Sequence, residues 1–134
     1  MIDLLRRRQL GDSVSEFIDT IPYFLDSDGE SLWHIVPGGR SFGFEGDDLT
    51  EFVRLCVLRL LNTGGIPVRH AEEGELNWTE QAQYGTTTDE IANAIVAEWL
   101  AKGGGDPKWD WLWFVTRRVL HTSRHWQAEH SSKR

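Results

Sequence analysis

An amphipathic helix pattern in the middle of the chain most constrains what this sequence can fold into. In LTEFVRLCVLRLL, residues 49–61, apolar side chains recur with the 3.6-residue period of an α-helix. They are Leu49, Phe52, Val53, Cys56, Leu60 and Leu61. Asp47 or Asp48 can cap the beginning of this helix, and the segment NTGG, residues 62–65, ends it. We therefore predict a central helix over residues 48–62, against which the other elements pack.

Two more helices are indicated by capping boxes, in which a Ser or Thr and a Glu three residues later bond each other's backbone N–H groups. The pairs are Ser13 with Glu16 and Thr87 with Glu90. Apolar residues follow each pair at helical spacing. We predict helices over residues 12–21, where Pro22 ends the pattern, and 88–102, which is followed by three glycines.

Other segments have the character of strands. SLWHIV, residues 31–36, predicts a short strand, and PGGR followed by SFGF predicts a turn into a second extended segment that ends near residue 44. IPVRH, residues 66–70, also favours a strand. KWDWLWFV predicts a strand over residues 109–115, with a helix following near 116–126.

Together these elements predict an α+β fold, a helix-dominated single domain with a small antiparallel sheet built from the 31–44 and 109–115 regions. The 134 residues of the chain suit one domain with one core. Residues 1–10 and 127–134 are expected to form flexible basic ends of this domain.

Trp109, Trp111 and Trp113 stand at every second position of the last predicted strand, so all three side chains would share one face. Two interpretations follow. The indoles either pack against the capped helices or form an exposed platform on which bases or sugars stack. Packing is favoured, because the acidic charge of the chain opposes binding of nucleic acid.

Charge is distributed unevenly along the sequence. Residues 11–116 carry 19 Asp and Glu against 6 Lys and Arg, a net charge of −13, whereas both ends are basic. An acidic body disfavours nucleic-acid binding, which needs clustered cations. It would steer a basic protein partner toward the surface and raise the association rate, although an acidic surface that only maintains solubility is the common alternative.

The sequence shows neither a membrane span nor a secretory signal. Its longest apolar run, residues 111–115, is much shorter than the roughly 20 residues that cross a bilayer. The start MIDLLRRRQL places arginines after a short apolar stretch and lacks a small-residue cleavage site. We therefore expect a cytoplasmic protein with no membrane partner.

Motifs for catalysis or cofactor binding are weak. Cys56 is the only cysteine, which excludes an internal disulfide, and its place in a helix pattern favours a buried apolar role over a reactive nucleophile. Neither a phosphate-binding glycine loop nor a serine nucleophile elbow occurs. DSDGE, residues 26–30, begins like a calcium loop but lacks the glycine and glutamate at the required spacing. No catalytic residue and no cofactor are predicted.

A C-terminal cluster is the candidate for metal binding. On a continuous helix His121, His125 and Glu129 would be spaced by four residues and could face one ion. The glutamate that follows the first histidine in zinc proteases is missing, and the cluster lies near the end of the chain. A metal-dependent enzyme that uses these residues is therefore the alternative to a binding protein.

The candidate binding surface is acidic. In AEEGELNWTEQAQYG, residues 71–85, four glutamates surround Trp78, which either anchors this polar connection to the core or serves as an exposed binding hot spot. Two further carboxylates lie at the predicted start of the central helix. The predicted binding residues are Asp47, Asp48, Glu72, Glu73, Glu75, Trp78 and Glu80.

Several segments follow one another in a characteristic order. They are FVRLCVLRLLNTGGIPV, then Trp78, then TTTDEIANAIVAEW, then WDWLWF, and they cover about residues 49–115. This order resembles that of small bacterial proteins of the toxin-immunity kind, in which a helix closing in tryptophan precedes an aromatic strand. The resemblance implies a small acidic protein that occludes a basic toxin or enzyme domain and supplies no catalytic residues.

The sequence thus predicts a noncatalytic acidic protein-binding module whose partner is a basic protein. The alternatives are the metal-dependent enzyme and a structural protein that dimerises through exposed tryptophans. Monomer and homodimer both stay open at this point.

Overall fold

The computed structural model describes residues 2–8, 11–71 and 77–131. Within them helices dominate and the paired strands are antiparallel, which confirms the predicted α+β class. The helices are α1 (Val14–Thr20), the 3₁₀ helix η1 (Ile21–Phe24), α2 (Leu32–Ser41), α3 (Gly46–Asn62), the 3₁₀ helix η2 (Ala82–Tyr84), α4 (Thr88–Ala101), α5 (Arg117–Thr122) and α6 (Arg124–Ser131). The strands, in sheet order, are β1 (Glu30–Ser31), β4 (Trp113–Val115), β2 (Ile66–His70) and β3 (Trp78–Glu80).

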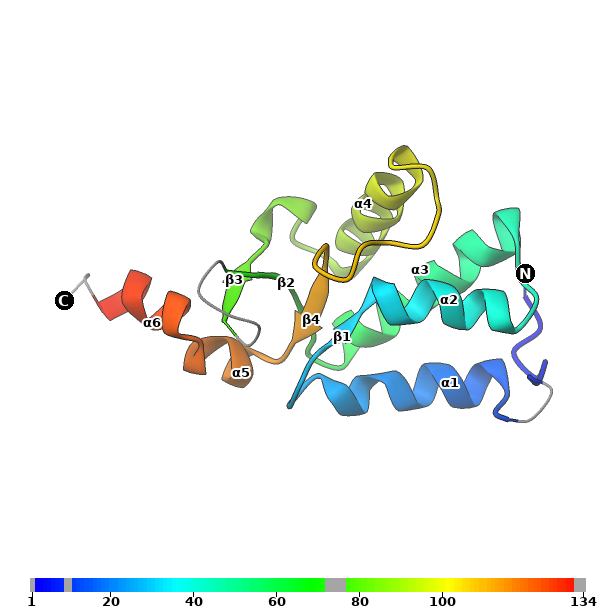
Figure 1. Cartoon of the computed structure of the whole chain (residues 1–134), viewed down its shortest axis with the longest axis horizontal. Helices are drawn as coiled ribbons and strands as arrows, with labels where there is room; N and C mark the ends of the chain where they lie inside the picture. Colours follow the sequence, from blue (N-terminus) through cyan, green and yellow to red (C-terminus); the bar gives the residue numbers. More distant parts are fainter. Residues whose placement is uncertain (1, 9–10, 72–76, 132–134) are drawn as a thin grey trace.

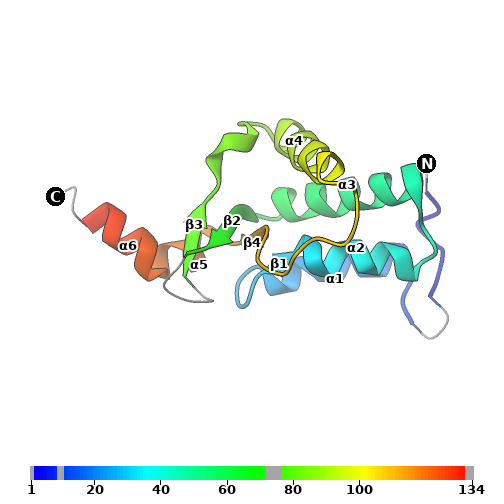
Figure 2. The same ribbon diagram turned by 45° about the horizontal axis from the view of Figure 1, so that its top comes forward.

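The sheet lies between two unequal groups of helices. Helices α1, α2 and α3 lie side by side towards the N-terminal end of the molecule, whereas α5 and α6 extend from the opposite end of the sheet (Figure 1 and Figure 2). Each group has its own apolar cluster. The larger cluster joins α1 to α4, and the smaller one joins the sheet to the C-terminal helices.

Strand β4 connects these two clusters. Phe114 points into the larger cluster, while its neighbour Val115 belongs to the smaller cluster together with Val68, Trp78 and Leu120. This division follows from the alternation of side chains along a strand. β4 also pairs with β1 on one side and β2 on the other, so it is central both to the sheet and to the packing.

The two predicted capping boxes are confirmed. The Ser13 and Glu16 side chains each bond the other's backbone N–H, and Thr87 and Glu90 do the same at the start of α4. The α3 helix begins earlier than predicted, with Glu45 as its N-cap residue. Asp47 and Asp48 therefore lie in the first turn instead of capping it, and their carboxylates there complement the helix dipole.

Helix α2 was not predicted from the sequence. The predicted strand over residues 31–36 and the predicted second extended segment ending near residue 44 are wrong, because only Glu30 and Ser31 form a strand here and a helix continues to Ser41. The helix contains Pro37 in its interior. Its buried positions, which include Leu32, Ile35, Val36 and Gly39, follow helical spacing that the Pro-Gly-Gly sequence obscured.

The aromatic segment also differs from the prediction. Only Trp113–Val115 form a strand, where residues 109–115 were expected. The following helix is broken at Ser123, whose backbone is extended between α5 and α6. The buried Ser123 hydroxyl accepts a hydrogen bond from Trp78 N–H at 2.7 Å and lies 2.5 Å from Asn77 Oδ1, to which it donates. These bonds fasten the C-terminal helices to β3, and they require the break.

The N-terminal segment runs beside α1. Ser15 N–H donates to the Leu4 carbonyl at 2.8 Å, and Val14 N–H donates to the Arg6 carbonyl at 2.9 Å. Leu4 and Leu5 are 46% and 78% exposed. The segment thus places two leucines on the surface next to α1. Among the described residues, no helix combines the length and the apolar character needed to span a membrane.

We predict that Gly39→Ala destabilises the protein even though alanine is the better helix former. A Cβ atom at position 39 would lie 2.6 Å from Leu49 Cδ1 and 2.7 Å from Phe52 Cδ1, and both side chains are buried. Overpacking of this kind costs about 1–3 kcal/mol, which exceeds the gain in helix propensity of about 1 kcal/mol. Urea denaturation should show a net loss of unfolding free energy.

Gly105→Ala is the matched control, since a Cβ there meets nothing within 4 Å and the residue does not need a positive φ. We expect its unfolding free energy to change by less than about 0.5 kcal/mol. Equal effects of the two substitutions would contradict the close approach of α2 to α3.

Candidate functional site

The predicted acidic surface does not form as one patch. Glu72, Glu73 and Glu75 lie outside the described residues. Asp47 and Asp48 are exposed at the beginning of α3, whereas Glu80 lies on β3. The 17 residues of α3 span about 25 Å, and β2 and β3 follow beyond its far end (Figure 1). The aspartates and Glu80 are therefore separated by about the length of α3.

The β3 part of the predicted surface has a structural role. Trp78 is only 1% exposed, and its ring packs 4.4 Å from that of His70. Glu80 forms an ion pair with Arg117 at 3.5 Å. Of the two interpretations of Trp78, the structure supports the one in which it anchors the polar connection to the core.

The three alternating tryptophans do not share a face. Trp109 stacks on His70 at 4.6 Å, and Trp113 meets the same imidazole edge-on at 5.3 Å. Trp111 points elsewhere, is 8% exposed, and donates its indole N–H to Glu98 Oε1 at 3.1 Å. The alternation fails because residues 109–112 precede the strand, so the segment forms neither one apolar wall nor one stacking platform.

The predicted metal cluster is divided by the helix break at Ser123. His125 contacts Glu129 within α6, but His121 belongs to α5 and stacks on Trp126 with the ring centroids 4.0 Å apart. Throughout the described part of the chain, no three His, Cys, Asp or Glu side chains are arranged to hold a metal ion.

Cys56 lies inside the larger apolar cluster. Its side chain is fully buried in α3, and this burial raises the pKa of the thiol well above its usual value. A thiol that stays protonated is a poor nucleophile. The apolar interpretation of Cys56 is therefore confirmed.

The structure reveals a groove that the sequence analysis missed. It lies between α1 and α3 and encloses about 360 Å³. Its apolar lining comes from Leu4 of the N-terminal segment, Ile18 of α1, and Leu55 and Leu58 of α3. We call this the α1–α3 groove. It brings together residues from three separate parts of the sequence, so no single pattern indicated it.

Carboxylates extend the same side of α3 beyond the groove. Asp47, Asp48 and Glu51 precede Leu55 and Leu58 at intervals of three or four residues, which places all of them along one helix face. We call the three carboxylates the acidic face of α3. The groove and the acidic face thus form a continuous strip, apolar at one end and negative at the other.

The acidic face carries uncompensated charge. None of its three carboxylates has an ion-pair partner among the described residues. Most other carboxylates do have an arginine partner. The paired ones are Asp12, Glu16, Asp19, Asp26, Glu80, Asp89, Glu98 and Asp106. A cationic partner would therefore find three carboxylates without ion-pair partners along one helix face at this position.

Comparisons with known proteins give no indication of the function. No protein-family model matches the chain, and neither a curated protein nor a solved structure matches it. The resemblance to immunity proteins therefore stays a prediction.

An acid–histidine pair, with Glu30 buried and His34 half exposed, lies at the beginning of α2. Glu30 is 3% exposed, and its Oε1 accepts a hydrogen bond from Ser31 N–H at 2.9 Å and lies 2.8 Å from His34 Nδ1. The hydrogen bond with Glu30 raises the pKa of His34 above its usual value, against a smaller opposing effect of burial. The protonated imidazole is thus the form that the fold favours.

We predict that this pair makes stability depend on pH. The pKa of His34 is higher in the folded than in the unfolded chain, so its contribution is fully present below the unfolded pKa of about 6.5. It is lost as the pH rises through the folded pKa. The free energy lost in His34→Ala, measured by urea denaturation, should be larger at pH 6 than at pH 8.5.

Glu30→Gln is the control, because removing the carboxylate removes the cause of the raised pKa. In that background burial and Arg8 still lower the pKa of His34, so the effect of His34→Ala should no longer be larger at pH 6 than at pH 8.5. A pH-independent effect of His34→Ala in the wild-type background would count against the pair.

Proposed function

We propose that this chain is a noncatalytic binding module that occludes a basic toxin or enzyme domain, the role suggested by its resemblance to immunity proteins. The observation that carries the proposal is the continuous strip on α3, in which the apolar groove leads into unpaired carboxylates. Such a strip fits an amphipathic segment that has apolar anchors and a cluster of Lys or Arg.

The groove supplies the apolar part of this recognition. Ile18, Leu55 and Leu58 are partly buried and rest on the larger cluster, so the floor of the groove is supported from below. Leu4 lines its edge and is 46% exposed. Arg59 also lines the groove, but Asp19 lies 3.3 Å from it and neutralises it. An apolar side chain of the partner would gain burial here without desolvating a free charge.

The acidic face would orient the partner and raise its association rate. Charges at the rim of an interface act mainly on the association rate, because they guide the partner during diffusional encounter. The net charge of −13 over residues 11–116 extends this attraction over the whole body. Salt should therefore weaken the complex chiefly by slowing association, since the Debye length falls to about 8 Å at physiological ionic strength.

We predict that Asp47→Asn/Asp48→Asn/Glu51→Gln slows association with the partner about tenfold at low salt while changing the dissociation rate little. The partner is first captured from a lysate of the native cells at low salt, and surface plasmon resonance then gives both rate constants. The thermal midpoint is checked as well, because the two aspartates also stabilise the start of α3.

The control is Asp28→Asn/Asp106→Asn/Asp110→Asn, which changes the net charge equally at exposed positions away from the α3 strip. It should slow association far less than the first variant. If both variants have the same effect, or if the captured protein is not basic, the acidic face is not the recognition surface.

We predict that Leu4→Ser raises the dissociation rate about tenfold, which corresponds to about 1.4 kcal/mol of lost apolar contact. Leu5→Ser is the matched control, because Leu5 is 78% exposed but does not line the groove. Both substitutions affect exposed leucines of the same segment, so the same resonance assay compares them directly. Equal dissociation rates of the two variants would show that the groove is not part of the interface.

A further inference from the structure

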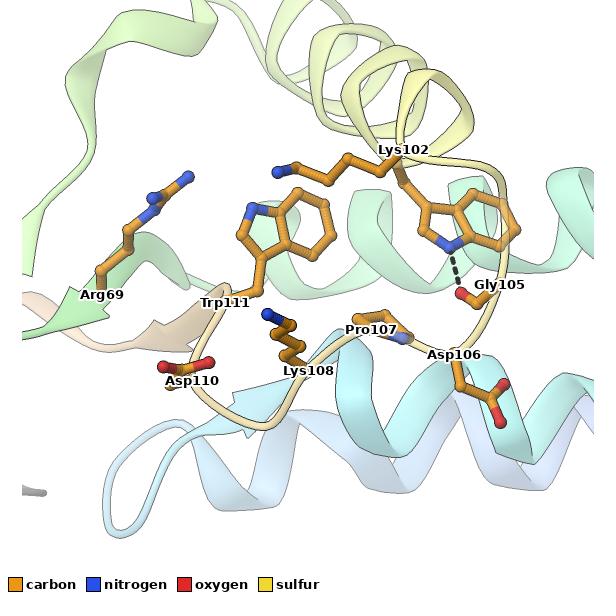
Figure 3. Close-up of a pocket in the computed structure, with 9 residues that line it drawn as sticks. Arg69, Lys102, Gly105, Asp106, Pro107, Lys108, Asp110 and Trp111 are labelled. Carbon is orange, nitrogen blue, oxygen red and sulfur yellow. Dashed lines mark hydrogen bonds between the residues drawn. The ribbon is translucent and has the colours of Figure 1, made fainter.

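A second pocket lies beside α4, away from the α1–α3 groove. It encloses about 460 Å³, within the range of roughly 300–1,000 Å³ that is usual for small-molecule sites. Its walls come from the end of α4, from the loop that leads to β4, and from β2 (Figure 3). We call it the α4 pocket. Its lining residues are Arg69, Trp99, Lys102, Gly105, Asp106, Pro107, Lys108, Asp110 and Trp111.

Basic side chains are concentrated at this pocket. Residues 11–116 contain only six Lys and Arg, and three of them, Arg69, Lys102 and Lys108, line it. They come from β2, from the end of α4 and from the loop, and their charged ends lie around the indole of Trp111 (Figure 3). Half of the Lys and Arg residues of this acidic region therefore line the α4 pocket.

The cations are only partly neutralised by the protein. Lys102 and Lys108 have no carboxylate partner among the described residues, and Lys102 Nζ lies 5.6 Å from the centre of the Trp111 ring. Arg69 lies 3.4 Å from Glu98 Oε1. That oxygen also accepts hydrogen bonds from Tyr84 and Trp111, so its charge is shared among three donors.

The rim carries two acidic groups with different roles. Asp106 is bound to Arg40 at 2.9 Å, so its charge is already compensated. Asp110 is exposed and has no ion-pair partner in the described ranges. Its carboxylate cancels part of the positive charge of the pocket, so a singly charged anion would gain little there. A multivalent anion would still gain from three cations.

The pocket is held in shape before any ligand arrives. Trp111 is buried and its N–H bond to Glu98 fixes the indole that forms the floor. Trp99 Nε1 donates to the Gly105 carbonyl at 2.8 Å (Figure 3). Arg40 donates to the Gly104 carbonyl at 3.2 Å, so the loop is fastened at two points. A preformed wall lowers the entropic cost of binding.

We propose that the α4 pocket binds a small multivalent organic anion, a phosphate ester or a polycarboxylate, through Arg69, Lys102 and Lys108. Guanidinium and ammonium groups donate charge-assisted hydrogen bonds to phosphate and carboxylate oxygens alike. This site is separate from the strip on α3, so it gives the binding module a small-molecule ligand in addition to its protein partner.

The test is an NMR titration of the indole N–H signals at constant ionic strength, with the Trp111 signal assigned from Trp111→Phe. The probes are pyrophosphate, citrate and, as a singly charged anion, acetate. We expect a saturable shift of the Trp111 signal with pyrophosphate or citrate at a dissociation constant below about 1 mM, and no saturation with acetate. Pyrophosphate alone would indicate a phosphate ester, and citrate alone a polycarboxylate. Saturation with none of the probes would overturn the proposal.

Charge variants separate the pocket from the general field of the protein. Lys102→Gln/Lys108→Gln should weaken binding at least tenfold, whereas Asp110→Asn should strengthen it about threefold. The control Arg117→Gln/Arg118→Gln changes the net charge equally, away from the pocket and from the α1–α3 groove, and should alter the dissociation constant less than twofold. Equal weakening by the lysine pair and the control would overturn the proposal. None of these residues belongs to the acidic face of α3. Anion binding by the α4 pocket and capture of the protein partner are therefore tested independently.

Discussion

The structure depends on strand β4, because its three residues connect the two apolar clusters and the neighbouring strands of the sheet. Phe114 enters the core formed by α1 to α4, while Val115 and Trp113 face the cluster beneath the C-terminal helices. The same short strand pairs with β1 and β2. A sheet of such short strands is stable only when both faces are covered, so each helix group depends on the other through β4. The residues just before this strand are consequently held in place, and Trp111 among them forms the floor of the α4 pocket.

The sequence predicted those parts of the fold that depend on local interactions. The capping boxes at Ser13 and Thr87 and the apolar period of α3 act within one helix, and all three helices are present. Helix α2 was missed because Pro37, Gly38 and Gly39 are typical of a turn, although here the glycines admit the rings of Phe17 and Phe52. That use of glycine depends on neighbours distant in sequence. The alternation of the tryptophans failed for a related reason, since a period of two predicts a shared face only where the chain is extended.

The candidate sites were less predictable than the fold. Charge counting identified an acidic body, but it grouped Asp47 and Asp48 with Glu80, which lies beyond the far end of α3. The acidic face of α3 groups three carboxylates that have no arginine partner within the described residues, and this depends on tertiary pairing. The groove needs Leu4, Ile18 and Leu55 to meet, and the α4 pocket needs Arg69 to approach Lys102. Neither meeting can be derived from spacing along the chain.

The distribution of arginines connects the two proposed sites. Arginine pairs with many of the described carboxylates, so unpaired charge is left where this pairing stops. It stops at the start of α3, where negative charge is left, and around Lys102 and Lys108, where positive charge is left. Within the described residues, no ion pair joins these carboxylates to Lys102 or Lys108. Each therefore stays available to a partner of the opposite sign, and one small acidic domain is able to present a cationic pocket without losing its attraction for a basic protein.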